Sequence, residues 1–265
     1  MKLHRLLVAA FLVFAVGQST ASAAEIFCDD FESYSTTADM QAVWGAAGLG
    51  TLDTVNGNPG QSMNHPGGTA NEHSIPLTPA TDEDPLCWEF DFYDDGVGNK
   101  RVTGALRDVN GSATGNQAFW EMGRYNSVND PESGLTVSGY AIRHVFVGGS
   151  PAGAAGWLTF VGNPAAQIGW HHFSATIGAT SALFELDLGD DGTVDASRTI
   201  TMTAGAGKLY NLLRLGGPSN VSSAGGGAKF DNLCVGCVVI PEPATMALAG
   251  LGLMGVVMAA RRRSA

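Results

Sequence analysis

Two acidic residues on one short apolar segment are the strongest candidates for chemistry in this chain. Residues 88–94 alternate between large apolar and polar side chains, and Glu89 and Asp91 are two positions apart. Side chains two apart on a β-strand project from the same face. Two carboxylates that flank a glycosidic bond can divide the roles of nucleophile and general acid. The interpretation we favour is more ordinary: a half-buried strand with an acidic outer face, which runs into a turn at residues 94–96.

A second acidic segment is a candidate metal site. Asp187, Asp191 and Asp195 follow one another at intervals of four residues in a glycine-containing stretch. Their spacing resembles part of an EF-hand-like or dockerin-type loop, in which carboxylate oxygens surround a calcium ion. Gly189 stands where a ligand is expected, and Arg198 replaces the final glutamate. We therefore favour a plain acidic hairpin tip and keep calcium as the alternative, the one candidate cofactor.

Histidine and tryptophan residues complete the candidates. His171 and His172 are consecutive on a predicted strand, so they face opposite sides and cannot chelate one metal together. Trp44, Trp120 and Trp157 are types that stack on sugars, but isolated aromatic residues are more often part of a hydrophobic core. We expect one histidine at the surface and the tryptophans in the core.

The C-terminal segment is the most specific signal. Residues 244–260 carry no charge, and a helix of that length spans about 25 Å, the lower limit for a bilayer core. The flanking residues are Pro241, Glu242 and Pro243 before it and Arg261, Arg262 and Arg263 after it. The prolines set the start of the helix, and the arginines favour a cytoplasmic C-terminus, which places the preceding region outside.

This tail, residues 238–265, closely resembles the PEP-CTERM sorting signal of Gram-negative bacteria. In that family Pro241, Glu242 and Pro243 would be the recognition motif, and Ile240 stands where Val is frequent. The resemblance implies that an exosortase, an integral membrane enzyme, cuts nearby and releases or re-anchors the region before the tail. It also implies an association with exopolysaccharide and biofilm surfaces.

The other end of the chain agrees with export. Two basic residues precede an apolar stretch at residues 6–16, and residues 21–23 are the small residues that signal peptidase accepts. We expect a signal peptide over residues 1–23 and an ectodomain over residues 24–237. The protein would be anchored in the inner membrane before processing and would lie at the cell surface or outside the cell afterwards.

The charge of the central region excludes one class of partner. The chain has 14 Lys+Arg and 25 Asp+Glu, a net charge of −11. Five basic residues and one acidic residue lie in the terminal segments, which leaves 9 against 24, or −15, for residues 24–237. Phosphate binding needs a basic surface, so nucleic acid is not an expected partner. Divalent cations, basic surfaces and neutral sugars are compatible with this charge.

The central region predicts an all-β fold. Short apolar runs separated by Gly, Asn, Asp and Pro clusters are typical of a sandwich or barrel, and no long segment has the pattern of an amphipathic helix. The expected strands are residues 87–93, 117–123, 140–146, 156–161, 171–177, 182–188, 198–202, 211–216 and 228–235.

Three segments, residues 169–177, 184–192 and 213–217, resemble the concanavalin A-like, laminin-G-type jelly roll. The first opens a strand on Trp-His, the second ends in an Asp-Gly turn, and the third is a late Leu-Arg-Leu-Gly-Gly strand. The resemblance implies an antiparallel jelly-roll sandwich whose first and last strands pair. Residues 27–32 and 229–234 suit those two positions.

Four cysteines, Cys28, Cys87, Cys234 and Cys237, would share an oxidising compartment. An even number of thiols in an exported chain indicates two disulfides, for which three connectivities exist. The pairing of end strands implied by the resemblance favours Cys28 with Cys234, which leaves Cys87 with Cys237. A single C-x-x-C is weak evidence for zinc or for a redox centre.

Glu89, Asp91 and Asp94 also resemble the E-x-D-x-x-E strand of laminarinase-like hydrolases, which share the jelly-roll fold. Asp94 stands in place of the acid/base glutamate, and its shorter reach matters where the paired carboxyls must lie about 5 to 5.5 Å apart. We therefore expect a noncatalytic module that binds polysaccharide. A glycoside hydrolase that uses Glu89 and Asp91 is the alternative, and a structural coat protein without a ligand is the third hypothesis.

Overall fold

The computed structural model describes residues 25–109, 118–145, 156–202 and 209–236. The expected signal peptide, Cys237, the sorting motif and the apolar segment 244–260 lie outside these residues. In the described ranges, no helix is long and apolar enough to cross a membrane.

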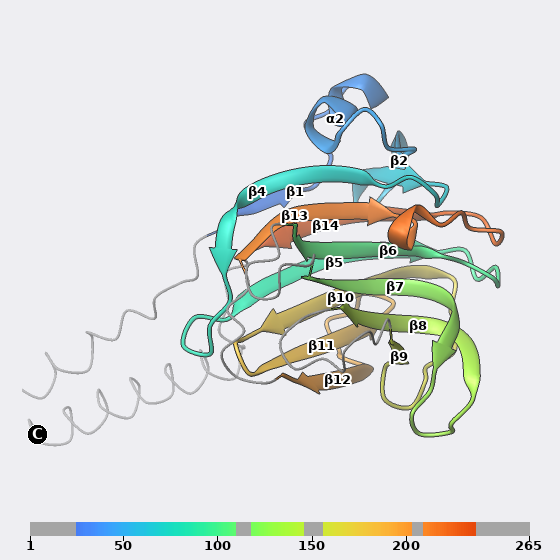
Figure 1. Ribbon diagram of the computed structural model, residues 1–265. Coiled ribbons are helices and arrows are strands. Elements are labelled where there is room, and N and C mark those ends of the chain that lie inside the picture. The colour runs from blue at the N-terminus through green and yellow to red at the C-terminus, as the bar shows by residue number, and fades with distance from the viewer. Residues whose placement is uncertain (1–24, 110–117, 146–155, 203–208, 237–265) are drawn as a thin grey trace, which may run out of the picture. The chain divides into compact units, whose positions relative to one another are not determined.

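Strands make up most of the described chain, in two sheets that we call sheet 1 and sheet 2 (Figure 1). Sheet 1 has, in spatial order, β12 (Ala196–Thr201), β11 (Ser181–Leu188), β10 (Gly169–Ile177), β5 (Leu86–Asp94), β14 (Ala228–Val235), β3 (Gly60–His65) and β2 (Thr51–Gly57). The short β1 (Phe27–Asp29) also pairs with β14, further along the edge that β3 occupies.

Sheet 2 has the order β4 (Asn71–Pro79), β13 (Leu209–Gly216), β6 (Val102–Asp108), β7 (Ala118–Asn129), β8 (Thr136–Val145) and β9 (Trp157–Thr159). Neighbouring strands in both sheets run antiparallel, apart from one parallel contact between β7 and β9. A short helix, α2 (Thr37–Trp44), lies against β2 and β4, and a 3-10 turn, η1 (Pro218–Asn220), follows β13.

The core lies between the sheets and is rich in aromatic side chains. Trp120 of sheet 2 lies 5.2 Å from Phe184 of sheet 1, measured between ring centroids. Gly104 of β6 faces Phe90 of β5, and a Cβ atom there would come within 2.5 Å of the Phe90 ring. The sheets approach closely at this point because glycine leaves room for the ring. The predicted all-β sandwich is therefore confirmed.

Every predicted strand overlaps a strand of the structure, whereas β2, β3, β4 and β6 were not predicted. Helix α2 was also missed; the hydroxyl of Thr36 accepts a hydrogen bond from the Asp39 amide and caps its start. Trp44 and Trp120 are fully buried, in agreement with the core positions expected for them.

A disulfide joins the first and last strands. Cys28 of β1 and Cys234 of β14 lie opposite each other in the register and form a disulfide, as predicted. Cys87 lies on β5, and its predicted partner Cys237 is outside the described residues, so that pairing stays a prediction.

Candidate functional site

The outer face of sheet 1 carries the acidic pair that the sequence singled out. On β5, Trp88, Phe90 and Phe92 are buried in the core. Glu89 and Asp91 alternate with them and project from the opposite face, as the period of two predicts. The Glu89 side chain is 30% exposed and that of Asp91 is 5% exposed, so the pair lies at the border of core and solvent.

Asp94 does not join this pair. It is fully buried on the inner side, where its carboxylate lies 3.0 Å from Nε of Arg124 in sheet 2. The register between β5 and β10 is continuous from Asp91 to Asp94, so the odd spacing puts the two carboxylates on opposite faces. The expectation that Asp94 occupies the third carboxylate position of a hydrolase strand is corrected.

His172 of β10 links the two outer carboxylates. Its Nδ1 lies 2.7 Å from Oδ1 of Asp91, and its Nε2 lies 3.8 Å from Oε2 of Glu89. Burial lowers the pKa of His172, but its hydrogen bonds and charge interactions with both carboxylates outweigh burial and raise the pKa to about 10. The imidazole is therefore protonated at neutral pH. His171 faces the core, so the predicted separation of the two histidines is confirmed.

A bulge in β14 brings two amides to Asp91. The register of β14 against β5 shifts between Asp231 and Cys234, and Asn232 has a left-handed backbone with φ of 45°. Its Nδ2 donates to Oδ2 of Asp91 at 2.7 Å. Nδ2 of Asn58, from the turn between β2 and β3, donates to the same oxygen at 2.9 Å. Asp91 is thus held by an imidazole and two amides.

Asp231 of β14 is the register partner of Asp91 on β5 and has no exposed surface. The backbone N–H of Asn232 donates to its Oδ1 at 2.8 Å, and that of Asn58 donates to its Oδ2 at 2.5 Å. Burial raises the pKa of Asp231 to about 7, and the nearby charges of Asp91 and Glu32 add to this effect against the two backbone hydrogen bonds. Asp231 is therefore the group of this site whose pKa is about 7, whereas the pKa of His172 is about 10.

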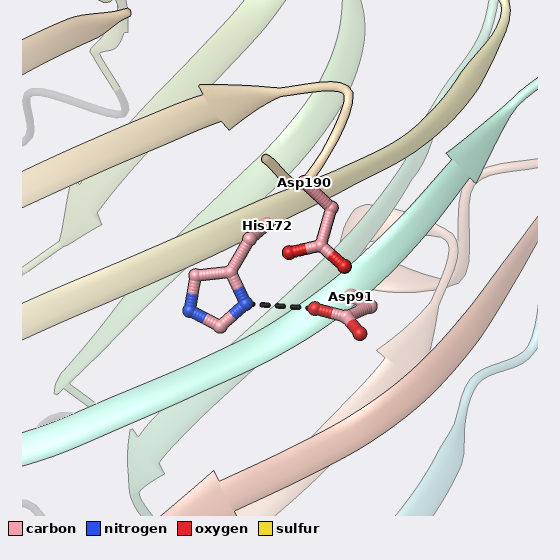
Figure 2. Close-up of side chains that lie close together, drawn as sticks. All are labelled: Asp91, His172 and Asp190. Carbon is pink, nitrogen blue, oxygen red and sulfur yellow. Dashed lines mark hydrogen bonds and ion pairs between the residues drawn. The ribbon is translucent and has the colours of Figure 1, made fainter. Parts of the chain in front are cut away.

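One set of side chains here has the geometry to hold a metal ion. Asp91, His172 and Asp190 each offer a ligand atom, and these atoms lie within 4.8 Å of one another. Figure 2 shows them converging from β5, β10 and the turn after β11. Two carboxylates and an imidazole are a mixed oxygen and nitrogen set, which suits transition ions better than calcium. Metal binding would require His172 to lose its proton.

The calcium candidates have other contacts in the structure. Both oxygens of Asp187 accept backbone N–H groups of the hairpin, from Asp191 and from Gly192. The carboxylate of Asp191 accepts from the Thr193 N–H, and that of Asp195 accepts from the Leu188 N–H at 2.7 Å. These carboxylates close the turn between β11 and β12. Asp190, at the tip of that turn, is the residue that reaches the cluster.

An aromatic pair lies in the next row of the same face. Tyr93 and Trp170 are register partners on β5 and β10, with ring centroids 5.5 Å apart, and both are half-buried. Nζ of Lys229 lies 5.5 Å from the Tyr93 ring and 2.8 Å from the Asp53 carboxylate. Sequence reasoning missed this pair, although the period of two from Asp91 and from His172 could have found it.

Comparison with known proteins finds one sequence match, the PEP-CTERM protein-sorting motif, at residues 239–263. The tail recognised in the sequence is therefore confirmed as this motif. It indicates an exported protein that is sorted to the cell surface, and it implies exosortase processing. No curated protein sequence matches the chain.

Several solved structures are similar to the chain in overall form. The exoplasmic/lumenal domain of VIP36, bound to Ca2+ and mannose, matches with a TM-score of 0.41 and 12% identity over 74% of this chain and 85% of that one. A glycosyl hydrolase family 16 protein from Mycobacterium smegmatis matches with a TM-score of 0.41 and 14% identity, over 80% and 100%. A GH54 α-L-arabinofuranosidase matches with a TM-score of 0.42 and 13% identity, over 69% and 38%. Scores of this size say nothing about what this chain binds.

Proposed function

We propose that the protein is a cell-surface module that binds polysaccharide without cleaving it, through the outer face of sheet 1 of a concanavalin A-like jelly roll. One observation carries the proposal: the Tyr93 and Trp170 pair lies in the register row next to the cluster around Asp91. Aromatic faces cover the apolar side of a sugar ring, and a few fixed polar groups orient its hydroxyls.

The contacts of the acidic pair favour binding over hydrolysis. Asp91 accepts hydrogen bonds from His172, Asn58 and Asn232, so its oxygens are occupied by the protein. Glu89 lies beside the same protonated imidazole. Asp94, the third carboxylate of the strand, is in the core. A carboxylate held in this way is poorly placed to exchange a proton or to attack a sugar.

The proposal is tested by measuring polysaccharide binding and reducing-sugar release with the same purified ectodomain. We expect binding without release. Trp170→Ala should weaken binding by about tenfold or more, as the loss of a central aromatic contact does, whereas Leu77→Ala, an exposed residue of sheet 2, should bind normally. Equal binding by both variants would remove this face as the site.

A glycoside hydrolase is the second candidate function. One observation supports it: Glu89 and Asp91 project from the same outer face of β5. Release of reducing sugar by the wild type that disappears in Glu89→Gln would establish the hydrolase and overturn the binding module.

Calcium at the Asp187, Asp191 and Asp195 hairpin is the alternative to the plain turn that these carboxylates form with backbone N–H groups. A ligand that binds only the folded state raises the melting temperature. A calcium titration followed by thermal melting tests this, with Asp191→Asn as the variant that should lose the response. If the melting temperature does not rise at millimolar calcium, the hairpin does not bind calcium.

A further inference from the structure

The outer face of sheet 2 carries a charged row that differs from the acidic face of sheet 1. Glu121 of β7 is fully buried and lies between two arginines from neighbouring strands. Its Oε1 is 3.0 Å from Nη2 of Arg107, and its Oε2 is 3.1 Å from Nη1 of Arg143. Two guanidinium groups share one carboxylate, so this trio has one positive charge in excess. Such a charge away from bulk water favours an anionic partner.

A cavity of about 370 Å³ opens beside Arg143, which lines it together with residues of β7, β9 and η1. This volume is within the range of small-molecule sites. Nη1 of Arg143 also donates to Oγ of Ser219, on the η1 side of the cavity. The buried Nε of Arg143 has no hydrogen-bond partner among the described residues. The protein itself therefore leaves part of the donor capacity of this guanidinium unused.

Stacked aromatic rings form another wall of the same cavity. Tyr125 and Trp157 lie with centroids 4.1 Å apart and ring planes 11° from parallel. The Arg143 guanidinium carbon lies 5.4 Å from the centroid of the Trp157 ring. Trp157 itself is only 7% exposed. Tyr125, which also lines the cavity, is the half-buried member of the pair.

We propose that this cavity binds a carboxylate-bearing sugar, a hexuronate unit of an acidic polysaccharide. Arg143 takes the carboxylate, the Tyr125 ring covers the apolar side of the sugar, and the exposed hydroxyls of Ser127 and Ser219 bond to its ring hydroxyls. A guanidinium fork matches a carboxylate better than any other basic side chain does. This site is separate from the outer face of sheet 1 that carries Trp170. It does not depend on the function proposed for that face.

The charge balance selects this class of anion. Residues 24–237 have a net charge of −15, which repels densely charged polyanions such as nucleic acids. One carboxylate per sugar ring matches the single excess positive charge of the Arg107, Glu121 and Arg143 trio. A single hexuronate unit therefore places its one carboxylate where the protein offers one excess positive charge.

The experiment compares tetragalacturonate with the uncharged galactotetraose by titration calorimetry on the full ectodomain. We expect tetragalacturonate to bind and galactotetraose to bind at least tenfold more weakly. Arg143→Lys keeps the charge but removes the fork, and Tyr125→Ala removes the ring platform; each should weaken tetragalacturonate binding by about tenfold. Leu135→Ala, exposed on the turn between β7 and β8, is the matched control and should bind as the wild type does.

Thermal melting of each variant shows that it is folded. Because Glu121 keeps Arg107 as a partner, Arg143→Lys should melt close to the wild type. Three results would overturn the proposal: no tetragalacturonate binding at millimolar concentration, equal affinity for both sugars, or unchanged affinity in both folded variants. Tetragalacturonate binding that Trp170→Ala abolishes would also overturn it, because the ligand would then occupy sheet 1.

Discussion

His172 holds its proton between two carboxylates, and this contact makes the stability of the domain depend on pH. The pKa of His172 in the folded state is about 10, above the usual value of 6.5 for an unpaired histidine. A group whose pKa is raised on folding stabilises the protein fully below the lower value and loses this contribution as pH rises through the higher one. The contribution of His172 is therefore complete below about pH 6 and is lost between about pH 7 and pH 10.

We expect His172→Gln to lower the free energy of unfolding by about 1.5 to 3 kcal/mol at pH 6, the range for a hydrogen bond to a charged group. The difference from the wild type should shrink steadily toward pH 10. Urea unfolding at several pH values measures it, and Thr176→Ala, an exposed residue of the same strand, serves as the control. A difference between variant and wild type that stays constant from pH 6 to pH 10 would contradict a protonated His172.

At the residue scale, the sequence could predict which face of a strand a side chain projects from, but not which residues from other strands and turns it contacts. The shared face of Glu89 and Asp91 and the separation of His171 from His172 follow from the period of a strand alone. Asn58, Asp190 and Asn232 reach Asp91 from turns and a bulge more than 30 positions away along the chain. No local pattern encodes such contacts, because they depend on which strands become neighbours. The inward position of Asp94 was predictable from its odd spacing, but the hydrolase resemblance pointed the other way.

At the scale of elements, the disulfide between β1 and β14 closes nearly the whole sandwich. The two cysteines are 206 residues apart, and in the loop-entropy model a cross-link over so long a loop stabilises the fold by about 5 kcal/mol, because it lowers the entropy of the unfolded chain. The strand β1 is only three residues long, so its place in the sheet depends strongly on this bond.

We expect the Cys28→Ser, Cys234→Ser double variant to melt about 10 °C below the wild type. The reason is that the unfolded chain regains the loop entropy that the disulfide removed, which lowers the free energy of unfolding and with it the melting temperature. Differential scanning calorimetry measures the shift. Thr176→Ala, an exposed substitution on β10, is the control and should melt with the wild type. A double variant that melts with the wild type would show that β1 is held by its pairing with β14 alone.

The second predicted bridge, Cys87 with Cys237, is supported by one backbone contact. The N–H of Gly236 donates to the carbonyl of Cys87 at 2.9 Å, which places the residue before Cys237 beside Cys87. We expect peptide mapping of the exported protein under non-reducing conditions to recover a Cys87–Cys237 linked peptide. Alkylation of Cys87 in the unreduced protein would show that the thiol is free.

Element prediction succeeded where apolar alternation is strong. β5, β10, β11 and β14 supply much of the core of sheet 1, and all four were predicted nearly to their ends. β2 and β3 contain several Asn, Asp and Gly residues, and β2 buries no side chain, so their sequences resemble loops. β4 contains two prolines and β6 an internal glycine, which are turn signals that tertiary pairing overrides.

At the scale of the whole molecule, the two proposed sites lie on opposite outer faces of the sandwich. One face offers carboxylates, amides and an aromatic pair, and the other offers a guanidinium and a second aromatic pair. A single domain could then join two different polysaccharide chains, and many copies on a surface would gain avidity without further contacts.

The sorting motif gives the prediction that belongs to this scale. Replacement of Pro241, Glu242 and Pro243 by alanine should prevent processing and leave the full-length chain in the membrane fraction of an exosortase-containing strain. Ile240→Val restores the residue frequent in the family and should be processed as the wild type is. Intact mass measurement distinguishes the products. Equal masses for the wild type in strains with and without an exosortase would contradict processing by this enzyme.

The position of β14 orders events in time. This strand is the last part of the sandwich to be synthesised, yet it lies inside sheet 1, between β5 on one side and β1 and β3 on the other. Until it arrives, β2 and β3 form one fragment and β5, β10, β11 and β12 form another, each with an open edge that can pair wrongly. A chain that is exported from its N-terminus therefore lacks β14 during almost all of its export. Factors that shield open strand edges would govern the yield of folded protein.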